Sequence, residues 1–90
     1  DKPEQSAAVR ERAAAVFARW RQVIAELLTA DGVSAARSRE LAVLVLSSFE
    51  GALVIARAGR DIEPVEAVHA QLRSLIVTET PSARTNRESR

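Results

Sequence analysis

Residues 41–58 read LAVLVLSSFEGALVIARA, and this apolar run constrains the fold more than any other part of the sequence. Ser47, Ser48 and Glu50 are its only strongly polar residues before Arg57. Projected as a helix at 100° per residue, the run has apolar or small residues on two separate sides. In a chain of 90 residues one neighbouring helix covers only one side, so the other needs another chain or a part of the protein outside this sequence. The first side consists of Val45, Phe49, Ala52, Leu53 and Ala56, and the second of Leu44, Ser47, Ser48, Gly51, Ile55 and Ala58.

The stretch before this run has the pattern of one long amphipathic helix. Apolar residues recur there at steps of three and four. Asp31 and Gly32 end the pattern, because glycine readily adopts the left-handed conformation that follows a last helical turn. We therefore predict a first helix from about residue 2 or 6 to Ala30, with one apolar stripe formed by Val9, Ala13, Val16, Phe17, Trp20, Val23, Ile24, Leu27 and Leu28.

The rest of the chain contains two further helices and a polar end. Ser34 is a natural N-cap for the second helix, which continues to about Ala58 and stops at Gly59. Asp61 is expected to cap the third helix, with Pro64 in its first turn. We predict an all-α fold of three helices without strands, a helical domain at 1–77 and a disordered tail at 78–90, which has almost nothing apolar to bury.

Composition argues against catalysis and metal binding. The chain has no cysteine, and His69 is its one histidine, so thiolate chemistry and histidine-rich metal sites are excluded. Paired carboxylates at catalytic spacing and phosphate-binding glycine loops are also missing. We expect no enzymatic activity and no cofactor.

The charges are balanced, with 13 basic and 12 acidic residues and a net charge of +1. Arg10, Arg12, Arg19 and Arg21 cluster on the first helix, but acidic residues interleave with them. A solvated helix face explains this cluster better than a phosphate-binding patch. We expect this chain to lack a nucleic-acid surface of its own.

No secretory signal is visible at the start, and the chain begins at Asp1 without methionine, which suggests a piece of a longer protein. Residues 41–56 are apolar, but sixteen residues fall short of the roughly 20 that a membrane-spanning helix needs, and Glu50 lies among them. We therefore expect a cytoplasmic protein with no membrane contact.

Aromatic residues offer one candidate for ligand binding. Phe17, Trp20, Ile24 and Phe49 are predicted to reach the same side of the first two helices, where they fill a core or line an apolar pocket for a small molecule. Glu50 is either a polar anchor in such a pocket or an interface or core carboxylate paired with an arginine such as Arg57.

The second helix carries a recognisable pattern, which is the run at 41–58 followed by Gly59-Arg60-Asp61 and then Pro64. It resembles the C-terminal regulatory domain of TetR-family transcriptional repressors, in the branch with LmrA/YxaF-like C-terminal domains. The segment from Phe17 to Leu28 is also similar to that branch.

This resemblance implies a ligand-sensing and dimerisation domain of a transcriptional repressor. The three helices would be the last three of the family's chain, and the final two would form a four-helix bundle with a second subunit. Operator DNA would be bound only through an N-terminal helix-turn-helix that this chain lacks. The expected partners are therefore a second copy and a small apolar effector.

The alternative hypothesis is a free-standing helical module that docks on another protein without a ligand. Under the leading hypothesis the small residues of the second helix let a partner helix approach closely, beside the apolar stripe of the third helix. The predicted dimer interface consists of Leu44, Ser47, Gly51, Ile55, Ala58, Val65, Val68, Leu72, Leu75 and Ile76.

Overall fold

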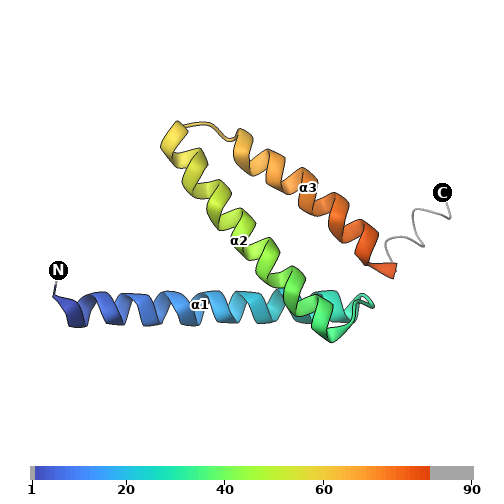
Figure 1. The fold of residues 1–90 in the computed structure, drawn as a ribbon, viewed down its shortest axis with the longest axis horizontal. Coiled ribbons are helices and arrows are strands. Elements are labelled where there is room, and N and C mark those ends of the chain that lie inside the picture. The colour runs from blue at the N-terminus through green and yellow to red at the C-terminus, as the bar shows by residue number, and fades with distance from the viewer. Residues whose placement is uncertain (1, 82–90) are drawn as a thin grey trace.

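The protein is an arrangement of three α-helices, seen in a computed structural model that describes residues 2–81 (Figure 1). The helices are α1 (Pro3–Ala30), α2 (Ala35–Gly59) and α3 (Glu63–Glu79), and the described part of the chain contains no strand. The predicted fold class and the two predicted breaks between the helices are confirmed.

The turn between α1 and α2 uses the residues that the sequence indicates. Gly32 has a φ of 98°, in the left-handed region, and the Val33 N–H donates to the Leu28 carbonyl at 3.1 Å. Ser34 caps α2 as predicted, because its Oγ accepts a hydrogen bond from the Arg37 N–H at 3.2 Å.

The turn between α2 and α3 differs in detail from the prediction. Gly59 remains inside α2, and Arg60 takes the left-handed conformation with a φ of 51°. Ile62, and not Asp61, is the residue that precedes α3, although the Asp61 carboxylate still accepts the Glu63 N–H at 3.0 Å. Asp61 therefore still accepts a hydrogen bond from a free N–H of the first turn of α3, although it lies one residue before the N-cap.

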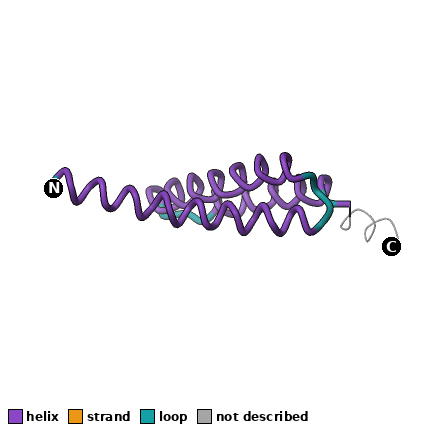
Figure 2. The backbone as a smooth tube through the Cα atoms, turned by 90° about the horizontal axis from the view of Figure 1, so that it is seen from below, coloured by secondary structure: helices purple, strands orange, loops and turns teal. Residues whose placement is uncertain are grey.

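The three helices form a single layer. α2 packs against α1 and α3, and the N-terminal half of α1 extends beyond both (Figure 1). The molecule measures 58 × 31 × 13 Å and is thin when seen edge on (Figure 2). Its radius of gyration is 16.2 Å, whereas a compact chain of this length has about 12 Å. Both broad faces of the layer are therefore open to solvent within one chain.

The core lies where the end of α1, the start of α2 and the end of α3 meet (Figure 1). Leu28, Val33 and Leu41 are buried there. Partly buried side chains from α1 and α3 pack around these three, namely Ile24, Leu75 and Ile76. Burial of this cluster contributes to holding the three helices together.

The end of α3 corrects the predicted start of the tail. Thr78 and Glu79 belong to α3, and Thr80 is only 2% exposed. The Thr78 and Thr80 hydroxyls donate to the carbonyls of Ser74 and Ile76, at 3.0 and 2.9 Å, so these polar residues are satisfied within the helix and its cap. The remainder of the predicted tail, 82–90, lies outside the described residues.

α2 is longer than the run of 16 residues considered from the sequence. It contains 25 residues and is long and apolar enough, by length and composition alone, to cross a membrane. One of its sides is used for packing inside the chain, where Leu41, Ala42, Ala52 and Ala56 are buried.

Candidate functional site

Most of the second apolar side of α2 is uncovered, since only Ser48 of its six residues is half-buried, and the neighbouring Val54 is exposed as well. We call it the outer face of α2, formed by the exposed residues Leu44, Ser47, Gly51, Val54, Ile55 and Ala58. Ile55, for example, is 61% exposed. Within the single chain, α1 and α3 therefore cover only one side of α2. The outer face remains an exposed apolar surface beside polar residues.

Gly51 lies in the middle of the outer face. A Cβ atom added at Gly51 would meet nothing within 4 Å. The chain therefore gives no internal reason for a glycine in the middle of this helix, where it costs stability relative to alanine. Close approach of another helix would supply such a reason.

The predicted interface stripe of α3 is used mainly inside the chain. Leu72 is buried, and Leu75 and Ile76 pack against the core cluster. Val65 and Val68 are half-buried. Of the ten interface candidates, the five on α2 are therefore exposed, whereas the five on α3 are buried or half-buried within the single chain.

A groove of about 300 Å³ lies between α1 and α2. Three of its lining side chains are apolar, one is a hydroxyl, and two carry opposite charges. We call it the α1–α2 groove, and it is lined by Phe17, Arg21, Val43, Leu46, Ser47 and Glu50.

The structure separates the four side chains predicted to line a ligand pocket. Phe17 lines the α1–α2 groove and is 41% exposed. Trp20 is 55% exposed, Ile24 packs against the core cluster, and Phe49 is half-buried. Only Phe17 of the four contributes to this groove, which is open along one side.

Two charged residues of the groove have no partner inside the described part of the chain. Glu50 is exposed and forms no ion pair with Arg57, so that pairing is wrong for the single chain. Arg21 likewise makes no ion pair or side-chain hydrogen bond among residues 2–81. From the sequence we interpret Arg21 as part of a solvated helix face. Its position one helical turn after Phe17 could have indicated that both side chains line the same groove.

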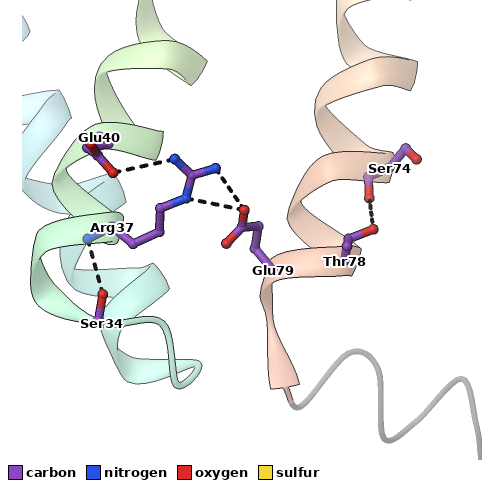
Figure 3. Close-up of polar contacts among 6 residues, drawn as sticks. All are labelled: Ser34, Arg37, Glu40, Ser74, Thr78 and Glu79. Carbon is purple, nitrogen blue, oxygen red and sulfur yellow. Dashed lines mark hydrogen bonds and ion pairs between the residues drawn. The ribbon is translucent and has the colours of Figure 1, made fainter.

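A polar contact joins the start of α2 to the end of α3. The Arg37 guanidinium donates from Nη2 and Nε to Glu79 Oε2, at 2.8 and 3.2 Å (Figure 3). The hydrogen bond with Glu79, and a weaker one with Glu40, raise the pKa of Arg37 above its ordinary value. Arg37 therefore stays charged across the physiological range.

The described residues offer no metal centre, since they contain no group of three histidine, aspartate or glutamate side chains close enough to hold an ion. His69 is exposed on α3. The two candidate sites are therefore the apolar outer face of α2 and the α1–α2 groove, which contains both apolar and charged side chains. Both are suited to binding.

Comparison with known proteins gives a consistent result. The profile of the family described as "Transcriptional regulator LmrA/YxaF-like, C-terminal domain", a TetR-type family, matches residues 1–71. The HTH-type transcriptional regulators MT0206 and Rv0196 of Mycobacterium tuberculosis, from strains CDC 1551 / Oshkosh and ATCC 25618 / H37Rv, are each 49% identical to the chain over 78 residues.

These matches cover 87% of the chain but only 40% of each relative. The chain thus spans about two-fifths of the length of the curated relatives it matches. No solved structure matches the chain significantly.

Proposed function

Because the chain belongs to the LmrA/YxaF-like C-terminal domains of TetR-family transcriptional regulators, we propose that it is the dimerisation and effector-sensing domain of a transcriptional repressor. The observation that carries this proposal is the outer face of α2, which is apolar and exposed along the helix while the opposite face is buried. A symmetric homodimer built on this face would cover it.

The surface area of the chain supports the need for a partner. Its accessible surface is 6922 Å², whereas a compact monomer of 9.8 kDa has about 5200 Å². A standard protein interface covers about 800 Å² on each partner, so the excess is large enough for a stable dimer. Two copies of α2 and α3 would make the four-helix bundle that the resemblance implies.

The regulatory step in this proposal is a shift between helix arrangements. A small, largely apolar effector that binds better to one arrangement would favour it, and so change the spacing of two DNA-binding regions. Operator DNA would be bound by a helix-turn-helix outside this chain, in a cytoplasmic protein. The predicted ligand residues Phe17, Trp20, Ile24 and Phe49 remain part of this proposal, with the rest of the pocket supplied from outside the chain.

Dimerisation is tested by Gly51→Leu. In the single chain the site is open, because a Cβ atom built there meets nothing within 4 Å and Gly51 is exposed, so the monomer should keep its helix content. In a dimer the added side chain is present twice at the crossing, and overpacking costs roughly 1–3 kcal/mol per copy. Sedimentation equilibrium should give a dimer for the native chain and a weakened dimer for the variant.

Ala70→Leu is the matched control, because Ala70 is exposed on α3 and lies on the side away from the buried Leu72. It should leave the dimer mass unchanged. A folded native monomer at tens of micromolar would contradict the proposal, as would a dimer that Gly51→Leu leaves intact.

A further inference from the structure

The α1–α2 groove has a chemistry that narrows the kind of effector. Building on the proposed effector-sensing role, we infer that the groove binds a small molecule with an apolar body, a carboxylate that pairs with Arg21 and a hydrogen-bond donor that Glu50 accepts. The effector would thus be an aromatic or similarly apolar acid with a hydroxyl or amino group, and not a purely apolar compound.

The charges of the groove support this class. Arg21 and Glu50 line one groove, yet their charged atoms are not within the 4.0 Å of an ion pair. Each is therefore available to a ligand. The planar guanidinium of arginine fits a carboxylate with two parallel hydrogen bonds, and a carboxylate accepts from a hydroxyl or ammonium group.

The charged groups of the groove come from different helices. Arg21 comes one turn after Phe17 on α1, and Glu50 comes two turns after Val43 on α2. The end of α1 crosses the start of α2, and the two helices diverge from there (Figure 1). A ligand with its acid and its donor on different parts of the molecule can reach both helices.

The apolar side chains of the groove offer accessible surface to a ligand body. Phe17 and Val43 are 41% and 46% exposed, and Leu46 is half-buried, so the chain leaves aromatic and aliphatic surface accessible on both helices. A volume of about 300 Å³ is at the lower end for small-molecule sites, which span roughly 300–1,000 Å³. One aromatic ring with short substituents suits such a site.

The test uses three matched probes with the full chain. 4-Hydroxyphenylacetate carries the acid, the ring and the hydroxyl, 4-hydroxyphenylacetamide lacks the charge, and phenylacetate lacks the hydroxyl. Titrations followed by amide chemical shifts should show 4-hydroxyphenylacetate binding with shifts around Phe17, Ser47 and Glu50. The amide should bind about fivefold more weakly, which is the upper end for a solvent-accessible ion pair, and added salt should reduce the difference.

Two variants test which side chain of the groove recognises which group of the ligand. Arg21→Gln should remove the preference for the acid over the amide, and Glu50→Gln should reduce the preference for the hydroxylated acid over phenylacetate. Arg19→Gln and Glu66→Gln are matched controls, since both residues are exposed and line none of the grooves described here. They should leave both preferences unchanged.

Three results would overturn the inference: equal binding of acid and amide, an acid preference that survives Arg21→Gln, or no shift at the groove with any probe. Each is separate from the proposed function, because dimer mass is measured independently. A Gly51-dependent dimer with no acid preference would refute the ligand class and leave the regulatory domain standing.

Discussion

Arg37 and Glu79 are 42 positions apart in sequence, and their side chains meet at 2.8 Å at the end of the α2–α3 pair opposite the connecting turn (Figure 3). Each charge is poorly placed in its own helix, since Arg37 is in the first turn of α2 and Glu79 is the last residue of α3. The helices are antiparallel neighbours, so Glu79 lies beside the positive start of α2 and Arg37 beside the negative end of α3 (Figure 1). The pair and the two helix dipoles therefore favour the same arrangement.

We predict that Glu79→Gln lowers the melting temperature of the chain, because it leaves Arg37 beside the first turn of α2 without its main acceptor. Glu66→Gln, at an exposed position in the first turn of α3, is the control for removing one negative charge. Thermal unfolding by circular dichroism measures both. Equal melting temperatures for the two variants would show that the Arg37–Glu79 contact contributes nothing specific.

The same pair predicts how stability depends on alkaline pH. A folded-state pKa of Arg37 above its unfolded value means that its contribution is complete below the unfolded pKa and is lost only as pH rises through the folded one. Both lie far above neutrality, so the difference in stability between native chain and Arg37→Gln should stay constant from pH 7 to about pH 9. Urea titrations across that range measure it. A difference that faded by pH 9 would rule out the ion pair as its source.

Gly32 and Gly59 are predicted to respond in opposite ways to alanine. Gly32 has a φ of 98°, and a Cβ there would lie 3.2 Å from Pro81 Cγ, so Gly32→Ala combines backbone strain with a close contact and should cost about 1 kcal/mol or more. Gly59 is helical with open space around it, so Gly59→Ala should be neutral or stabilise by up to about 1 kcal/mol. Chemical denaturation of both variants gives the comparison. Loss of stability at both positions would contradict it.

Leu41 is the best-buried large side chain of the core, at 1% exposure, and it contacts the junction of all three helices. Leu41→Ala should destabilise the chain by about 2–5 kcal/mol, because it removes buried methyl groups and leaves a cavity. Val9→Ala, at a largely exposed position of α1, should change stability by no more than about 0.5 kcal/mol. Since a small single-layer chain has little stability to lose, partial unfolding of the Leu41 variant in buffer is the expected observation.

Much of the fold follows from local sequence patterns. The three helices, the break at Asp31 and Gly32, and the Ser34 cap are set by residues close together in the chain, and all are confirmed. The two-sided apolar pattern of α2 also indicates correctly that a single neighbouring layer leaves one side uncovered. Such features depend on periodicity and capping, which a sequence displays directly.

The errors arise where distant residues meet. The segment at 78–81 looks like a polar tail, yet Glu79 pairs with Arg37 and Pro81 packs against Gly32. The stripe of α3 with Leu72 is predicted to face a partner chain, and the structure adds that part of it is buried against this chain's own helices. Apolar periodicity identifies a face to be covered but not which chain covers it. Arg21 was missed for a related reason, since only the crossing of α1 and α2 places it in a groove.

Trp20 provides the last prediction, because it is the only tryptophan and is 55% exposed on α1. We expect the native chain to show the red-shifted emission of a largely hydrated indole and to be readily quenched by acrylamide. Since Trp20 lies on α1 and the proposed dimer contact is the outer face of α2, emission should not change on dilution from dimer to monomer, nor with Gly51→Leu. An emission maximum that moves with the dimer fraction would place α1 in the interface and contradict a contact made by α2 and α3 alone. A blue-shifted, protected indole in a monomeric sample would instead contradict the open single-layer arrangement of the chain.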